Sequence, residues 1–201
     1  MAYQYVPGAT AVGIAFSKGV VLAAEKRVAY GTFVMSRSGK KVFRITDRVG
    51  AACAGMVADM QVLIKEVSLY AKIREMELGR PLPPNSIAKL MSVLMYERRS
   101  YPLLTQVIVG GIGYDGNAIY SLDPLGSVIP DDYTAVGSGA EMAIGIIESE
   151  YKKELSEEEA KELALRSIKS AIRRDAASGD GVDMLVITEG GMYEESRKFS
   201  S

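Results

Sequence analysis

The spacing of apolar residues in the first half of the chain predicts strands followed by one long helix. Apolar runs separated by turn-forming residues indicate five strands, at residues 11–15, 20–24, 34–36, 41–45 and 49–54. The first two flank Ser17-Lys18-Gly19 and are apolar throughout, so we expect a hairpin with both faces covered. From Val57 the apolar positions recur at helical spacing as far as Leu78-Gly79.

Apolar positions in the second half predict three more helices and a second group of strands. The run Pro81-Leu82-Pro83-Pro84 interrupts the helical pattern, and Asn85 or Ser86 is expected to cap a helix over residues 87–99. Strands are predicted at residues 104–110, 118–122, 127–129 and 184–187, with a last one after Gly190-Gly191. Two helices are predicted at residues 140–151 and 160–175, the second opened by a capping box from Ser156 to Glu159.

The order of these elements indicates an α+β fold class. Strands alternate with pairs of helices, and we find no linker, repeat or low-complexity tract that would divide the chain. Because every sheet and helix pair must bury an apolar face, this order favours two packed sheets with a helical layer outside each.

Composition and charge exclude several functional classes. The 201 residues contain 24 Lys and Arg against 25 Asp and Glu, and a net charge of −1 does not indicate a partner for nucleic acid or an anionic membrane. The longest apolar stretches fall far short of the roughly 20 residues that a membrane span needs. Residues 1–8 have neither the basic nor the apolar region of a signal peptide. We therefore expect a cytoplasmic protein.

Two residue counts narrow the possible chemistry. The chain has no histidine, which excludes Ser-His-Asp catalysis, Cys-His catalysis and a His-ligated metal site. It has a single cysteine, Cys53, which excludes an internal disulfide and a zinc site built from several cysteines. Cys53 stands in an apolar run, so we expect a small core residue, and we expect no metal and no cofactor.

Seven segments, in order and with matching spacing, resemble the β-type subunits of the proteasome. They cover nearly the whole chain and lie at residues 9–14, 19–27, 39–45, 54–55, 109–111, 137–139 and 174–179. Only eight residues precede the first motif, whereas the family's α-type subunits begin with a long extension, so the resemblance is to the β type. The absence of histidine is similar to archaeal versions.

The resemblance implies a fold, a domain division and partners. The fold is the four-layer αββα sandwich of N-terminal-nucleophile hydrolases, with a leader at residues 1–9 and one domain at residues 10–201. The expected partners are α subunits and other β subunits in stacked seven-membered rings, a regulatory ATPase bound through the α ring, and unfolded polypeptide as substrate.

The resemblance also implies a mechanism that needs no histidine. Family members free an N-terminal Thr whose hydroxyl attacks the peptide bond while its own α-amine accepts the proton. Lys41 matches the catalytic lysine, and Glu25 matches its acidic partner, where the family more often has Asp. The remaining matches are a polar network at Ser138, Asp175 and Ser178, an oxyanion-hole residue at Gly55, and pocket-lining residues at Val28 and Cys53.

The chain departs from the family at the nucleophile, where Ala9 stands in place of Thr. Ala9 lies 16 residues before Glu25 and 32 before Lys41, which are the family's separations. A chain in this register can neither attack a peptide nor process itself, and we expect a non-catalytic ring subunit beside an active sister chain. Ala11, which also replaces a common Thr, favours a natural paralogue over a single replaced nucleophile.

Two other readings of the chain stay open at this point. Cleavage after Ala9 would expose Thr10 as the nucleophile of an active threonine endopeptidase, although each separation would then be one residue short. A one-residue slip turns a strand side chain to the opposite face, unless a bulge repairs it. An amidase or acylase of the same superfold is the third and weakest reading.

Overall fold

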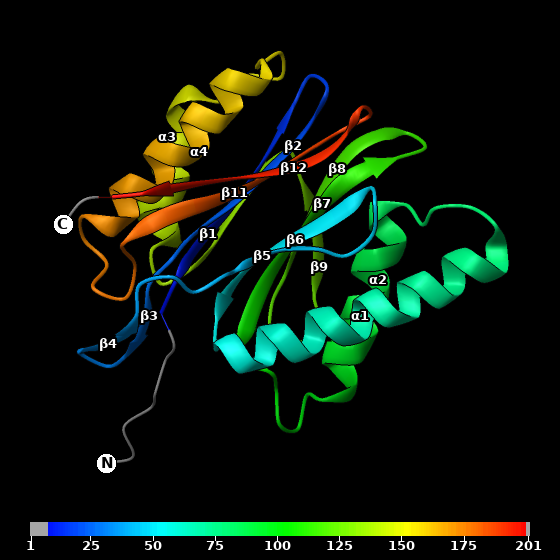
Figure 1. Ribbon diagram of the computed structural model, residues 1–201, viewed down its shortest axis with the longest axis horizontal. Helices are drawn as coiled ribbons and strands as arrows, with labels where there is room; N and C mark the ends of the chain where they lie inside the picture. Colours follow the sequence, from blue (N-terminus) through cyan, green and yellow to red (C-terminus); the bar gives the residue numbers. More distant parts are fainter. Residues whose placement is uncertain (1–7, 200–201) are drawn as a thin grey trace.

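Two antiparallel five-stranded sheets stack face to face, and a pair of helices covers the outer face of each (Figure 1). The computed structural model describes residues 8–199. The first sheet has the order β10 (Tyr133–Gly137), β1 (Thr10–Phe16), β2 (Gly19–Glu25), β11 (Gly181–Thr188) and β12 (Gly191–Lys198). The second has the order β5 (Val42–Arg44), β6 (Val49–Gly55), β7 (Thr105–Gly113), β8 (Gly116–Leu122) and β9 (Val128–Asp131). The four-layer αββα sandwich is thereby confirmed.

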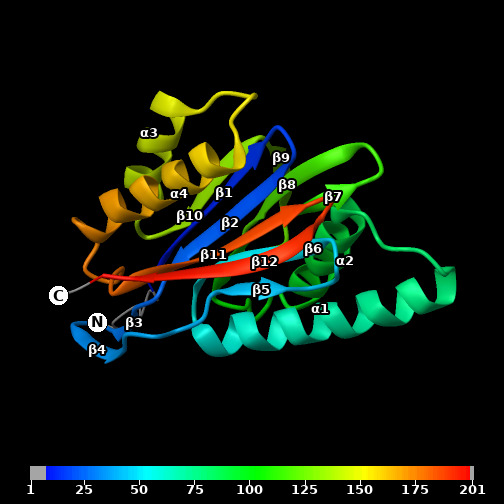
Figure 2. The same cartoon turned by 45° about the horizontal axis from the view of Figure 1, so that its top comes forward.

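The helices form the two outer layers, and a small hairpin stands apart from the sheets. Helices α1 (Val57–Leu78) and α2 (Pro84–Glu97) cover the second sheet, and α3 (Ala140–Glu150) and α4 (Glu157–Ile172) cover the first (Figure 2). The hairpin consists of β3 (Val28–Tyr30) and β4 (Phe33–Ser36). No helix in the described part of the chain is long and apolar enough to cross a membrane.

Alternation along β1 explains how one strand serves two cores. Val12, Ile14 and Phe16 pack toward α3 and α4, whereas Ala11 and Ala15 pack between the sheets. Successive strand side chains point to opposite faces, so an apolar run such as this one is covered on both sides.

All four predicted helices are present, and three of their boundaries, the start of α2 and both ends of α4, differ from the prediction by three residues. The capping box is present: Ser156 Oγ accepts from Glu159 N, and the Glu159 carboxylate accepts from Ser156 N. Neither Asn85 nor Ser86 caps α2, because the helix begins at Pro84, whose missing N–H is tolerated in the first turn. Helix α4 ends at Ile172, before residue 175.

Two strands were not predicted from the sequence. Strand β10 is half-buried along most of its length, so buried and exposed positions do not alternate clearly. It also follows directly on two acidic residues, Asp131 and Asp132. Strand β3 has only three residues, of which two are half-buried and Tyr30 is exposed. Strand β10 matters for function, because it pairs with the start of β1 and places Ser138 beside Ala9.

Candidate active site

The residues predicted to form the site come together at one end of the sandwich. Ala9 directly precedes β1, and Glu25 ends β2. Lys41 directly precedes β5, and Gly55 ends β6. The remaining members lie in two connections: Ser138 follows β10, and Asp175 and Ser178 lie between α4 and β11.

Lys41 and Glu25 form a buried ion pair. The side chain of Lys41 is 1% exposed and that of Glu25 is fully buried. Lys41 Nζ donates to Glu25 Oε1 and, at 2.5 Å, to the carbonyl oxygen of Arg27. Glu25 Oε2 accepts from the backbone N–H of Arg27 at 2.7 Å and of Gly179 at 3.0 Å. Burial raises the pKa of the Glu25 carboxyl, and the charge of Lys41 acts in the opposite direction.

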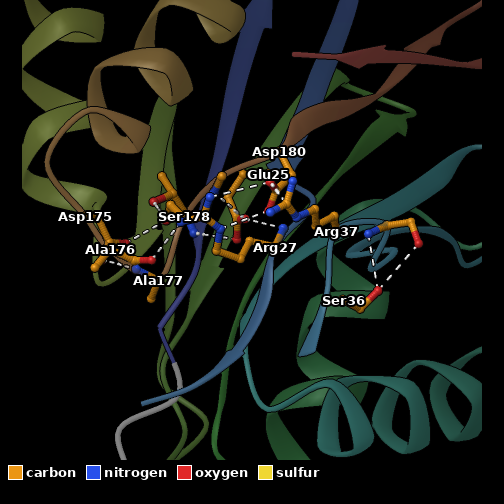
Figure 3. Close-up of polar contacts among 12 residues, drawn as sticks. Glu25, Arg27, Ser36, Arg37, Asp175, Ala176, Ala177, Ser178 and Asp180 are labelled. Carbon is orange, nitrogen blue, oxygen red and sulfur yellow. Dashed lines mark hydrogen bonds and ion pairs between the residues drawn. The ribbon is translucent and has the colours of Figure 1, made fainter. Parts of the chain in front are cut away.

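A chain of hydrogen bonds surrounds the backbone nitrogen of Ala9. Ala9 N donates to Ser138 Oγ at 3.1 Å, and Ser138 Oγ donates to Asp175 Oδ2 at 2.6 Å. Ser178 Oγ donates to the same carboxylate oxygen at 2.6 Å. This arrangement, partly drawn in Figure 3, connects the nitrogen of residue 9 through the Ser138 hydroxyl to the Asp175 carboxylate and from there to the Ser178 hydroxyl.

The side chain of Thr10 lies on the other face of β1. Thr10 and Gly137 are partners, as are Ala11 and Ala24, and neither pairing of β1 contains a register shift. A Cβ at Gly139 would collide with Thr10 Oγ1, with Ala171 close by, so the hydroxyl faces the layer of α3 and α4.

The hydroxyl of Thr10 is already engaged in that position. Thr10 is fully buried, and its Oγ1 lies 2.7 Å from Ser178 Oγ. Because Ser178 donates its own proton to Asp175, the hydrogen bond between the two hydroxyls is donated by Thr10.

Gly55 and Val28 line a small pocket beside the buried ion pair. Lys41 lines the same pocket, and so does Gly8, the residue that precedes Ala9 in the sequence. Gly55 has φ +130°, and a Cβ there would collide with the carbonyl oxygen of Leu104. Only glycine fits this backbone, and because residue 55 has no side chain, none covers its backbone N–H.

Cys53, which was expected to line the pocket for the residue before the cut, is not among the residues that line this small pocket. Side chains alternate along β6, so Ala52 and Ala54 face the first sheet and Cys53 faces α1 and α2. The residue is fully buried, and burial raises the pKa of its thiol, which stays protonated at neutral pH. Cys53 is therefore a core residue, as its place in an apolar run indicated.

Sequence reasoning gave no role to Arg27 and Asp180, which complete the polar site. Arg27 Nε donates to Asp180 Oδ2 at 2.9 Å, and Arg27 Nη1 donates to the carbonyl oxygen of Ala176 at 3.0 Å (Figure 3). Arg27 stands in one of the matched segments, two residues after Glu25, and this proximity was the signal that could have drawn attention to it.

The fold and the placement of the site together define a class. Stacked antiparallel sheets between two helical layers, with a buried Lys–Glu pair and a polar network at the start of β1, form the sandwich of an N-terminal-nucleophile hydrolase. The family model described as "Proteasome subunit" matches residues 6–187. The chain belongs to the proteasome subunit family.

Comparison with individual proteins specifies the type of subunit. "Proteasome subunit beta 1" of Nitrosopumilus maritimus (strain SCM1) is 58% identical over 191 residues, which cover 95% of this chain and 96% of that protein. The protein of the same name from Cenarchaeum symbiosum (strain A) is 58% identical over 189 residues, covering 94% and 97%. "Proteasome subunit beta 2" of Thermofilum pendens is 52% identical over 199 residues, covering 98% and 96%. The chain is thus a β-type subunit of the archaeal kind.

Proposed function

We propose that this chain is a non-catalytic β subunit that completes the inner ring of a proteasome, while a sister β chain supplies the active threonine. The observation that carries the proposal is the surroundings of Ala9. Its backbone nitrogen binds Ser138, within the network that the family uses around its terminal threonine. Ala9 therefore occupies the position of the nucleophile, and its methyl side chain cannot attack a peptide bond.

The position of Thr10 argues against the alternative of an active endopeptidase. Its hydroxyl is fully buried on the side of α3 and α4 and is hydrogen bonded to Ser178. The backbone N–H of Thr10 lies 3.4 Å from Glu25 Oε1, whereas Ser138 binds the nitrogen of Ala9. A nucleophile at residue 10 would need β1 to rotate its side chain to the opposite face, and β1 has no bulge that would do so.

The leader belongs to the same proposal. Residues 1–7 of the expected leader lie outside the described residues. Gly8 lines the pocket beside Lys41, and a Cβ on Gly8 would collide with Ala177 and Ser138. Because self-cleavage in this family requires the hydroxyl that Ala9 lacks, we propose that the leader stays attached to the domain at residues 10–201.

Exposed apolar side chains on α1 support the proposal that the chain works within a larger particle. Val62, Leu69, Ile73 and Met76 are between 46% and 76% exposed on one long helix. A row of exposed apolar residues of this size marks a surface that a partner covers. We propose that the partners are α subunits and sister β subunits in stacked seven-membered rings in the cytoplasm, with an ATPase on the α ring delivering unfolded polypeptide.

Particles in which the sister nucleophile has been disabled provide the test. We would co-express the α subunit, the disabled sister chain and this chain, and assay a fluorogenic peptide. The unchanged chain is expected to give no hydrolysis above background. Ala9→Thr is expected to restore hydrolysis, and adding Lys41→Ala to that variant is expected to abolish it.

The matched control is Thr10→Ala in the same particles, with the sister nucleophile disabled. If hydrolysis is present in particles with the unchanged chain and disappears with Thr10→Ala, then Thr10 is the nucleophile and the proposal is wrong.

A further inference from the structure

Asp180 has an unusual backbone conformation next to the polar site. It is the one non-glycine residue within residues 8–199 that has a positive φ, at +70°, and it stands between Gly179 and Gly181. This left-handed conformation is uncommon for residues other than glycine, and Asp and Asn tolerate it better than most. Asp180 therefore turns the chain from the loop after α4 into β11.

The carboxylate of Asp180 is held by Arg27. Arg27 Nε and Nη2 donate to the two oxygens of Asp180 at 2.9 and 3.5 Å. The side chain of Asp180 is 11% exposed and that of Arg27 is 26% exposed, so the ion pair is largely shielded from water. Charge-assisted contacts of this two-point kind fix orientation as well as adding energy.

Arg27 also contacts the segment that precedes Asp180. Its Nη1 donates to the carbonyl oxygen of Ala176 at 3.0 Å. A Cβ at Gly179 would collide with the guanidinium group, so that group packs directly on the backbone of Gly179. One side chain from the link between β2 and β3 thus contacts the loop at Ala176, Gly179 and Asp180, which Figure 3 shows in part.

The segment held in this way supplies the contacts of the site. Gly179 N donates to Glu25, Ser178 Oγ donates to Asp175, and Asp175 accepts from Ser138. The backbone of Arg27 takes part as well, since its N–H donates to Glu25 and its carbonyl oxygen accepts from Lys41 Nζ. The loop and the buried ion pair therefore share one anchoring residue.

We propose that Arg27 and Asp180 form a positioning pair that holds residues 175–179 against the ends of β1 and β2. Neither side chain touches residue 9 itself. They act through Ser178, Gly179 and Asp175, whose hydrogen bonds need the loop in a single conformation. The pair would have this role in a silent subunit and in an active one alike, because it concerns the placement of the loop.

Arg37 lies near the same carboxylate but contributes less. Its Nε is 3.8 Å from Asp180 Oδ1, and its side chain is 68% exposed. An exposed ion pair at this distance contributes little to stability. Replacing Arg37 is therefore the matched control, because it removes a cation near Asp180 that does not hold the loop.

The test is hydrogen–deuterium exchange on assembled, co-expressed particles, followed by mass spectrometry of peptides. Asp180→Asn keeps a residue that tolerates positive φ and removes the charge, so it separates the ion pair from backbone strain. We expect peptides that cover residues 175–179 to exchange on the order of tenfold faster in this variant, since hydrogen bonds to charged groups are lost. Peptides from α1 and β8 are expected to be unchanged.

Arg27 provides the second half of the experiment. Arg27→Ala is expected to accelerate the same peptides, and Arg27→Lys, which keeps the charge, is expected to restore part of the protection. Because the two residues act as one unit, Arg27→Ala with Asp180→Asn should exchange no faster than Arg27→Ala alone. Arg37→Ala should match the unchanged chain.

Two outcomes would overturn the proposal. One is unchanged exchange of residues 175–179 in both Asp180→Asn and Arg27→Ala. The other is faster exchange spread evenly over the chain, which would mean that the pair stabilises the whole fold and does not position the loop.

Discussion

The two sides of the candidate site differ in the polar groups that they carry. Around Lys41 the full set of polar contacts is present, with a buried ion pair that binds the backbone of Arg27 and Gly179. At Ala9 the backbone nitrogen donates to Ser138, and the side chain is a methyl group without a hydroxyl.

This difference follows from what each change costs the folded protein. Replacing the side chain of an N-terminal nucleophile by a methyl group removes one polar atom and leaves no buried charge unpaired. Removing one member of a buried ion pair leaves the other member charged in an apolar environment, which is strongly destabilising. We infer that a subunit that no longer cuts can lose its nucleophile while the ion pair is kept for stability.

The largest expected effect comes from breaking the ion pair. Lys41→Ala should lower the free energy of unfolding by about 3–5 kcal/mol, because Glu25 remains buried without its partner. Chemical denaturation of the purified full-length chain would measure this loss. Lys40→Ala is the matched control, since Lys40 forms an exposed ion pair with Glu194 and its loss should be small.

The pH dependence of Lys41→Ala sharpens the same comparison. Burial raises the pKa of Glu25 in the folded chain, and Lys41 opposes this shift. Without Lys41 the pKa of Glu25 in the folded chain is raised further. Above the pKa that Glu25 has in the unfolded chain, keeping Glu25 ionised and buried therefore lowers the stability, whereas protonated Glu25 has no such cost. The loss caused by Lys41→Ala should therefore be largest near neutral pH and shrink as the pH falls toward 4.5, the ordinary value for Glu. A loss that grows as the pH falls would contradict this account.

A smaller loss of stability is expected from a substitution at Gly139, which tests on which face of β1 the side chain of Thr10 lies. A Cβ at residue 139 collides with Thr10 Oγ1 and lies close to Ala171. Gly139→Ala should therefore cost about 1–3 kcal/mol in unfolding free energy through overpacking. Adding Thr10→Ala should recover part of that loss. If the double variant is no more stable than Gly139→Ala, the side chain of Thr10 does not face this layer.

The smallest expected effect concerns the hydroxyl of Thr10 alone. Thr10→Val keeps the shape and removes the hydrogen bond to Ser178, so it should lower the unfolding free energy by about 1 kcal/mol. The peptidase activity of particles containing Thr10→Val should equal that of unchanged particles. A marked fall in that activity would assign a catalytic role to Thr10.

The sequence predicted most elements and the first hairpin, because their signals are local, and it did not predict the pairing of β10 with β1, which is non-local. The strand predicted at residues 41–45 and the capping box at Ser156 rest on local signals that the structure confirms. No local signal places β10 beside β1, or Ser138 beside Ala9. Register is set by packing over a long sequence separation, which a single sequence does not display.

The site shows the same division. Lys41, Glu25, Ser138, Asp175 and Ser178 could be selected because they stand in motifs of a familiar family. Their hydrogen-bond partners, and the contacts of Arg27 with Asp180 and Ala176, depend on a loop conformation that includes a positive φ. Cys53 matches a pocket position of the family, and strand alternation turns its side chain toward α1 and α2.

The N-terminus of this subunit in assembled particles tests the central claim most directly. We would co-express the chain with its α subunit and sister β chain, purify the particles, and determine the intact mass and N-terminal sequence of this subunit. A silent subunit with its leader attached should begin at Met1 or Ala2. A subunit that begins at Thr10 would have a free threonine amine and would contradict the account.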